Sequence, residues 1–410
     1  MEAETQPKPI ISPKEWRLIY LLFAIQFTHI LDFVIMMPLG PQFIHDLQIG
    51  PNRFGTLVSV YGFAAALGSL LAATMLDQFD RKKSLLFLYG GFTISTLFCG
   101  LAPTYELLLV ARSAAGAFGG VVGVAIMAII GDVFADYRRG TATGAVMSAF
   151  AVSSVAGVPL GLLLAETFGL WAPFVFLAGL SAIIFVFGLK LLPTFRGHIL
   201  DGPRQLHHSF WAIVKHPNHR RAYLFSLVLV LGSFTVIPYI ATYMVQNTGR
   251  SKEDVKWVYL VGGLCTLVSM NLIGRMSDRY GKLIIFRVTA FLSLLMCLWI
   301  TNLPTSSLFV SILVGSLFMV TTSGRIVPAQ AMMIGSASPQ IRGAFLGINT
   351  ALQHFAMGAA SLIGGLLLSE SDGKLEGYPL VGAIAAGCAL IALWVAGRLR
   401  PTPEGIRRKG

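Results

Sequence analysis

Long apolar stretches recur along the entire chain and are separated by short polar connections. A helix needs about 20 apolar residues to cross a bilayer, and Gly or Pro within it is tolerated where helices pack closely in lipid. Twelve stretches meet this condition, near residues 16–37, 54–76, 84–102, 106–130, 142–166, 171–192, 222–246, 255–275, 284–302, 307–334, 344–369 and 379–397. The pattern predicts an all-α integral membrane protein with twelve transmembrane helices.

Two polar loops indicate an internal duplication. Residues 274–282 read Gly-Arg-Met-Ser-Asp-Arg-Tyr-Gly-Lys, and residues 73–82 form a degenerate copy at the same place in the first half. Their acids, Asp77 and Asp278, are 201 residues apart, and the matching pairs Arg139-Gly140 and Arg342-Gly343 are offset by 203. We therefore expect two pseudo-symmetric six-helix bundles. The expected division is a tail at 1–15, a first bundle at 16–192, a linker at 193–221, a second bundle at 222–397 and a basic tail at 398–410.

The composition is that of a membrane protein. Hydrophobic residues make up 55% of the chain and charged residues 12%, and the mean hydropathy is +0.72. With both termini in the cytoplasm, 24 of the 31 Lys and Arg fall on cytoplasmic segments, five on outer loops and two inside spans. This bias predicts a multi-pass protein of the cell inner membrane with both termini cytoplasmic. It also accounts for the net charge of +12 without nucleic-acid binding.

Other classes of protein are disfavoured. The first apolar stretch is too long for a cleavable signal peptide and is expected to remain as a span. The cysteines at 99, 265, 297 and 388 lie in apolar stretches without metal-type spacing, so we expect neither disulfides nor a metal site. The sequence contains no His-Glu-x-x-His, Gly-x-Ser-x-Gly or Gly-x4-Gly-Lys-Ser/Thr segment, which argues against an enzyme, a bound cofactor and ATP-driven transport.

The second loop copy carries a family signature. Gly274, Asp278, Arg279, Gly281 and Lys282 satisfy every constrained position of Gly-x-x-x-Asp-Arg/Lys-x-Gly-Arg/Lys. On this motif the chain, over roughly residues 15–400, resembles the major facilitator superfamily and, within it, the twelve-span drug:proton antiporters. The first copy keeps Asp77 and Arg81 but has Ala73, Gln78 and Asp80 at the other constrained positions.

Three further segments resemble motifs of this family. Arg112 and Gly116 resemble the fourth-span motif, and residues 157–161 (Gly-Val-Pro-Leu-Gly) resemble the fifth-span antiporter motif without its usual Gly-Pro adjacency. In that segment Gly157, Pro159 and Gly161 are expected to permit a helix bend. Residues 31–41 resemble the first-span motif, except that Asp32 stands where the motif has glycine.

The resemblance implies a central cavity lined by the first, fourth, seventh and tenth spans, with the substrate site near the midplane. An ionisable side chain inside a span costs about 2.5–3.5 kcal/mol on insertion scales, so it needs a partner or water. Asp32 and Arg112 lie at similar depth and are expected to interact. We assign proton coupling to Asp32 and His29. The expected substrate-binding residues on or near the cavity wall are Arg112, Arg325, Tyr239, Tyr243, His354 and Gln353.

Each assignment has a structural alternative. Asp32 is either a proton carrier or a static carboxylate locked to Arg112. Arg112 either binds substrate or only packs helices together. The histidines and tyrosines are either site residues or ordinary buried polar residues.

The resemblance also implies a conformational latch that holds the halves together on the cytoplasmic side when the cavity faces outward. Its residues would be Asp77, Arg81 and Asp132 in the first half, and Gly274, Asp278, Arg279 and Gly281 in the second. The alternative is that these loops only set topology. Gln78 and Asp80 give the first copy one more acid and one less base than expected, which predicts a weaker latch.

The leading functional hypothesis is proton-coupled efflux of a small amphipathic molecule by alternating access. The alternative is an importer or facilitator of an anionic or zwitterionic metabolite such as an amino acid or organic acid, because two cavity cations face one acid. Two matched halves favour rocking around a central site over a channel or receptor. The expected partners are substrate, protons and the lipid bilayer, and we expect a monomer.

Overall fold

The computed structural model describes residues 12–75, 78–134, 136–194, 206–338 and 341–401. Within them twelve helical segments are long and apolar enough to cross a membrane, which confirms the number of spans predicted. The segments are Pro13–Ile35, Pro51–Ala72, Arg81–Leu101, Tyr105–Val133, Arg138–Phe168, Trp171–Leu191, Pro217–Asn247, Lys252–Tyr280, Lys282–Thr301, Leu308–Gly335, Arg342–Leu367 and Tyr378–Ala396.

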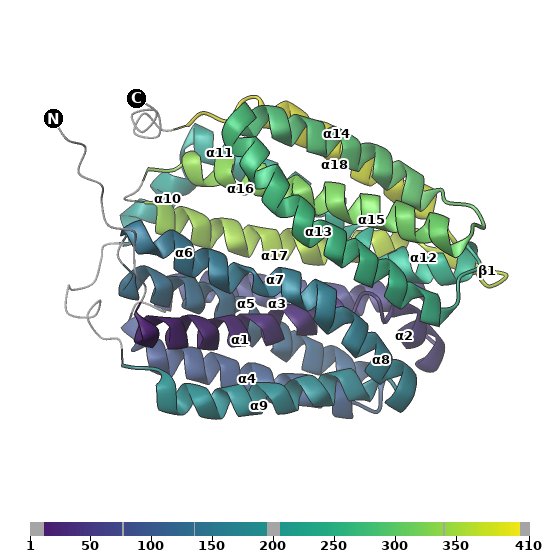
Figure 1. Cartoon of the computed structure of the whole chain (residues 1–410), viewed down its shortest axis with the longest axis horizontal. Helices are drawn as coiled ribbons and strands as arrows, with labels where there is room; N and C mark the ends of the chain where they lie inside the picture. The colour runs from purple at the N-terminus through teal and green to yellow at the C-terminus, as the bar shows by residue number, and fades with distance from the viewer. Residues whose placement is uncertain (1–11, 76–77, 135, 195–205, 339–340, 402–410) are drawn as a thin grey trace.

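The spans form two pseudo-symmetric six-helix bundles, as predicted (Figure 1). The first bundle contains α1 (Pro13–Ile35), α2 (Gly40–Asp46), α3 (Pro51–Met75), α4 (Arg81–Leu101), α5 (Tyr105–Val133), α6 (Asp136–Met147), α7 (Ala149–Val152), α8 (Val158–Phe168) and α9 (Trp171–Leu191). A short connecting helix, α10 (Leu206–Lys215), lies within the linker expected at 193–221. The second bundle contains α11 (Pro217–Phe234), α12 (Ile240–Asn247), α13 (Lys252–Tyr280), α14 (Lys282–Thr301), α15 (Leu308–Gly324), α16 (Ile326–Gly335), α17 (Arg342–Leu367) and α18 (Tyr378–Ala396).

The two ends of the bundle differ in their charged residues. We call the end where α1 and α4 begin the basic end, and the opposite end the hairpin end, because a short β-hairpin lies there between α17 and α18 (Figure 1). The hairpin pairs β1 (Ser369–Ser371) with β2 (Lys374–Glu376) in antiparallel register. The five cations expected on outer loops, Arg53, Arg250, Lys252, Lys256 and Lys374, lie on segments at the hairpin end.

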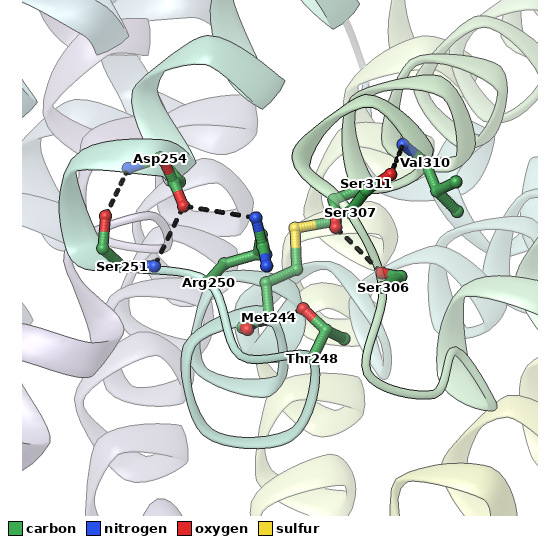
Figure 2. Close-up of polar contacts among 9 residues, drawn as sticks. All are labelled: Met244, Thr248, Arg250, Ser251, Asp254, Ser306, Ser307, Val310 and Ser311. Carbon is green, nitrogen blue, oxygen red and sulfur yellow. Dashed lines mark hydrogen bonds and ion pairs between the residues drawn. The ribbon is translucent and has the colours of Figure 1, made fainter.

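Side-chain caps fix the loops at the hairpin end (Figure 2). The Ser251 hydroxyl accepts the backbone N–H of Asp254 at 3.2 Å, and the Asp254 carboxylate accepts the N–H of Ser251 at 3.1 Å. This reciprocal capping box starts α13. The Ser307 hydroxyl caps α15 by accepting the N–H of Val310 at 3.4 Å.

Three spans are interrupted, and a proline lies at or just after each interruption. A π-helical turn, Ser153–Gly157, precedes Pro159 between α7 and α8, and a 3₁₀ turn containing Pro238, Ile237–Tyr239, separates α11 from α12. The break between α15 and α16 falls at Arg325, three residues before Pro328. Proline has no N–H to donate to the carbonyl four residues earlier, so helical hydrogen bonding is lost at each point.

The halves meet along a seam of glycines between α3 and α17. A Cβ added to Gly62 would lie 2.7 Å from the backbone nitrogen of Gly358, and one added to Gly365 would lie 3.2 Å from the Cα of Gly55. The two glycines of each helix are seven residues apart, so they share a helix face. Only glycine permits this backbone approach, which gives close van der Waals packing between helices in lipid.

A second contact between the halves runs from the π-helical turn and α8 to α13. A Cβ on Gly263 would lie 3.1 Å from the carbonyl oxygen of Ser154, and nearer the hairpin end the Lys256 ammonium lies 3.1 Å from the Glu166 carboxylate. Toward the basic end, a Cβ added to Gly131, Gly140, Gly335 or Gly343 would meet nothing within 4 Å. In this conformation these contacts join the halves from the middle of the spans toward the hairpin end.

Candidate functional site: a buried ion pair beside the contact between the halves

The expected contact between Asp32 and Arg112 is present. Arg112 Nη1 of α5 donates to Asp32 Oδ2 of α1 at 2.9 Å, and both side chains are 0% exposed. The Thr96 hydroxyl of α4 donates to the other carboxylate oxygen at 3.3 Å. The Arg112 guanidinium also lies over the Tyr61 ring of α3, 4.5 Å from its centroid. Four helices of the first half therefore contribute to one charged cluster.

Small residues let these helices approach one another. The backbone of Gly116 in α5 lies directly against Tyr61, where a Cβ would clash with the backbone carbonyl oxygen. A Cβ on Gly157 would lie 2.7 Å from the Leu31 side chain, and one on Gly161 would lie 2.5 Å from the Ile35 side chain. The expected bend segment thus packs on α1 at positions flanking Asp32. The structure places Gly157 at the end of the π-helical turn and Pro159 in the first turn of α8.

The pair is not fully satisfied. Arg112 Nε and Nη2 are buried and have no hydrogen-bond partner within the described part of the chain. A buried arginine that loses its carboxylate costs about 3–5 kcal/mol, because the remaining charge is desolvated and uncompensated. The charge state of Asp32 therefore strongly affects how α1 is held against α5.

One layer of aromatic side chains separates this pair from the second half. Phe33, next to Asp32, packs against Tyr61 in a tilted arrangement with ring centroids 5.2 Å apart. Phe33 also contacts Phe234 at the end of α11, with centroids 5.8 Å apart. A shift of α1 at Asp32 would reach the contact between the halves through Phe33.

The two expected histidines come from opposite halves. His29 of α1 is half-buried, and its Nδ1 has no hydrogen-bond partner among the described residues. His354 Nδ1 of α17 hydrogen-bonds the Ser69 hydroxyl of α3 at 3.1 Å. The neighbouring Gln353 instead bonds within its own half, donating to the Ser226 hydroxyl at 2.9 Å.

Arg325 lies where the sequence did not place it. The sequence predicts a position on the wall between the halves, but the side chain is 3% exposed and points into the second bundle. Its Nη2 donates to the Ser233 hydroxyl at 2.8 Å. The enclosing residues, among them Ser293, Cys297 and Thr322, all belong to α11, α14, α15 and α18. No described carboxylate pairs with it.

Tyr239 and Tyr243 are packed and hydrogen-bonded to backbone. The Tyr239 hydroxyl donates to the carbonyl oxygen of Ser361 at 2.6 Å, and the Tyr243 hydroxyl donates to that of Leu303 at 3.1 Å. Both side chains are buried. This arrangement is what the packing alternative predicts, since neither ring presents a free polar tip.

The latch residues of the first half join helices of that half. Arg81 Nε of α4 donates to the Asp132 carboxylate of α5 at 2.9 Å. Asp77 lies outside the described residues. Asp80, which the sequence interpretation treated as excess charge, is the N-cap of α4, and its carboxylate accepts the N–H of Lys83 at 3.2 Å.

In the second half, Gly281 is the single residue between α13 and α14 and has φ +98, a conformation that favours glycine. Gly274 faces α16, where an added Cβ would lie 3.8 Å from Val327. Asp278 is exposed and makes no ion pair within the described part of the second half. The Arg279 guanidinium lies 5.3 Å from the Tyr280 ring centroid.

Several residues of the site were missed by sequence reasoning. Thr96, Tyr61 and Ser69 carry no sequence signal, because uncharged polar residues are common in packed spans. Ser233 and Phe234 did carry a sequence signal. They follow Asp32 and Phe33 by 201 residues, the same offset as the two polar loops. Among described residues, no group of three His, Cys, Asp or Glu side chains is placed to hold a metal ion.

Two six-helix halves in contact around buried charged and aromatic residues define a membrane transporter rather than an enzyme. The model of the Major Facilitator Superfamily matches the chain twice, over residues 22–221 and 222–410, so the chain belongs to this superfamily.

The chain is 25% identical to the "Uncharacterized MFS-type transporter YbcL" of Bacillus subtilis (strain 168), over 92% of this chain and 94% of that one. It is 22% identical to a "Probable sugar efflux transporter" of Mannheimia succiniciproducens, over 92% of both. Among solved structures, a bacterial homolog of the human lysosomal transporter Spinster has a TM-score of 0.70 at 14% identity, covering 95% of both chains. At this identity the likeness concerns the fold.

Proposed function

We propose that the protein is a proton-coupled secondary transporter that exports a small amphipathic molecule by alternating access. One observation carries the proposal: the acid of the first span, Asp32, is completely buried, paired with Arg112, and adjacent to the contact between the halves. An ionisable group in this position inside a membrane protein is typical of proton relays and substrate pathways.

Protonation would change the packing of α1. An ionised Asp32 holds Arg112 by a charge-assisted hydrogen bond, which is stronger than a neutral one. A protonated Asp32 loses that attraction, and α1 is freed relative to α5 at the residue that precedes Phe33. Proton binding then biases the equilibrium between two arrangements of the halves, provided that their proton affinities differ.

We further propose that the basic end is cytoplasmic, with both termini on that side of the inner membrane, and that the protein acts as a monomer. The distribution of Lys and Arg supports this orientation. With the halves in contact toward the hairpin end, the conformation described here then faces the cytoplasm. Export is favoured by the relative described as a probable sugar efflux transporter.

The alternative is uptake of an anionic or zwitterionic metabolite. Arg325 favours it specifically, because this buried cation has a hydroxyl partner but no carboxylate among the described residues. A carboxylate substrate would supply the missing charge if the second bundle opened toward it.

Transport in proteoliposomes tests the proposal. A pH gradient is imposed and uptake of tetraphenylphosphonium, methyl thiogalactoside and citrate is measured, representing a lipophilic cation, a sugar and a carboxylate. We expect gradient-driven movement of one of the first two, lost in Asp32→Asn and kept in Glu370→Gln, an exposed acid of β1. Unchanged coupling in Asp32→Asn would overturn proton coupling. Citrate transport that is lost in Arg325→Ala would establish the alternative.

A further inference from the structure

A groove on the outer surface of the first half lies between α1 and α9. It has a volume of about 300 Å³ and is lined by Arg17, Tyr20, Leu21, Ala24, Ile184, Phe187 and Leu191. In each helix the lining residues are spaced three or four positions apart, so those of α1 lie on one face of α1 and those of α9 on one face of α9. Leu21 and Ile184 are buried and form its floor, whereas Tyr20 is 64% exposed at its edge.

The groove is apolar along its length and cationic at one end. From Arg17 to Ala24 it extends about 10 Å along α1, away from the basic end. Arg17 stands at its mouth, and Lys14 lies one turn earlier on the same face of α1. Lys190 precedes the lining residue Leu191 in the last turn of α9.

The cations at the mouth of the groove are not neutralised by any described residue. Lys14, Arg17 and Lys190 make no ion pair with any described residue. The nearest acid in sequence, Glu15, is already engaged: its carboxylate accepts the N–H of Ser12 at 2.8 Å and pairs with Arg138 at 2.8 Å. Among the described residues, the positive charge at the mouth of the groove is therefore uncompensated.

Aromatic residues place the mouth at the level of lipid headgroups. Trp16 stacks on Tyr20 with ring centroids 5.5 Å apart, immediately beside Arg17. Trp and Tyr concentrate where the hydrocarbon region meets the headgroups. Cations at this level next to an apolar groove between spans match the two parts of an anionic phospholipid.

We propose that the α1–α9 groove selectively binds an anionic phospholipid of the leaflet at the basic end, with one acyl chain in the groove and the headgroup phosphate at Arg17 and Lys190. The site is separate from the Asp32–Arg112 pair, and it does not depend on the direction or coupling of transport. α1 contributes residues to both, through its first turns to the groove and through Asp32 to the pair.

Native mass spectrometry of the full chain in mixed micelles tests this site. The micelles contain equal amounts of phosphatidylglycerol and phosphatidylcholine with identical chains, and bound lipid is counted. We expect phosphatidylglycerol to be preferred, and Arg17→Gln/Lys190→Gln to weaken its binding by about 25-fold, from about fivefold for each cation. Lys374→Gln, which removes an exposed cation at the hairpin end, should change nothing.

A second variant separates the groove from the headgroup contact. Ala24→Phe fills the groove while leaving every cation in place, so binding of both lipids should fall and the preference should remain. The proposal is overturned by equal retention of the two lipids in the unmodified protein, by undiminished phosphatidylglycerol binding in the double variant, or by unchanged binding in Ala24→Phe.

Discussion

Asp32 and Ser233, 201 residues apart, each bond the buried arginine of their own half. Asp32 accepts from Arg112 at 2.9 Å, and Ser233 accepts from Arg325 at 2.8 Å. Each is followed by a phenylalanine, and the two rings contact one another across the halves. The duplication thus retains a buried arginine in each half, but among the described residues only Arg112 has a carboxylate partner.

Removal of the first-half carboxylate should destabilise the protein. Asp32→Asn leaves Arg112 buried without its counter-charge, and we expect the free energy of unfolding to fall by about 3–5 kcal/mol. Thermal unfolding in detergent measures this. Asp32→Asn/Arg112→Gln removes both charges and should recover most of the loss. Equal stability of Asp32→Asn and the unmodified protein would mean that the pair contributes nothing to folding.

The second-half arginine should respond to its hydroxyl partner. Ser233→Ala removes the hydroxyl that accepts a hydrogen bond from Arg325, so the free energy of unfolding should fall by about 1–3 kcal/mol. Ser233→Asp supplies the carboxylate present in the first half and should stabilise the protein at neutral pH. That gain should disappear on acidification, because a protonated carboxyl group no longer attracts the guanidinium.

A matched control for the serine variants is Ser181→Ala, which changes a buried serine of the first half. Its stability should differ from that of the unmodified protein by less than the Ser233→Ala loss. A stable Ser233→Ala protein, or a Ser233→Asp protein whose stability ignores pH between 4 and 8, would contradict the assigned interaction.

The glycine seam should determine which arrangement of the halves is populated. Gly62→Ala places a Cβ 2.7 Å from the backbone of Gly358, so the α3–α17 contact must loosen. In a cysteine-free background carrying Gly131→Cys, we expect thiol labelling at position 131 to slow as the basic end closes. Gly144→Ala, where an added Cβ meets nothing within 4 Å, serves as the control. Identical labelling rates at position 131 with and without Gly62→Ala would show that the glycine seam does not bias the conformation.

Asp80 should act as a helix cap. Asp80→Ala removes the acceptor for the Lys83 N–H and should cost about 1 kcal/mol, whereas Asp80→Asn should retain most of the cap. Denaturant unfolding of the two variants measures the difference.

The latch prediction is tested separately by Gln78→Arg/Asp80→Gly, which should shift cysteine accessibility toward closure at the basic end. No shift would leave this loop as a topology signal.

The sequence by itself determined the twelve spans and the two halves. Insertion into lipid depends on the length and hydropathy of each stretch, and both are local properties. It also predicted the Asp32–Arg112 contact, because the two residues lie at similar depth in neighbouring spans of one half. The loop signature was enough to indicate the superfamily. Part of this signature reflects local backbone geometry, because Gly281 has a positive φ that favours glycine.

Only the tertiary structure decided where the side chains point. Successive residues of a helix differ by about 100° in direction, so a small rotation about its axis moves a side chain from the contact between the halves into one bundle. Arg325 follows Gly324 at the break between α15 and α16, and its direction is set there by α11 and α14. The hydroxyls of Tyr239 and Tyr243 likewise donate hydrogen bonds to backbone carbonyls of segments distant in the sequence. Such hydrogen bonds depend on packing rather than on sequence spacing.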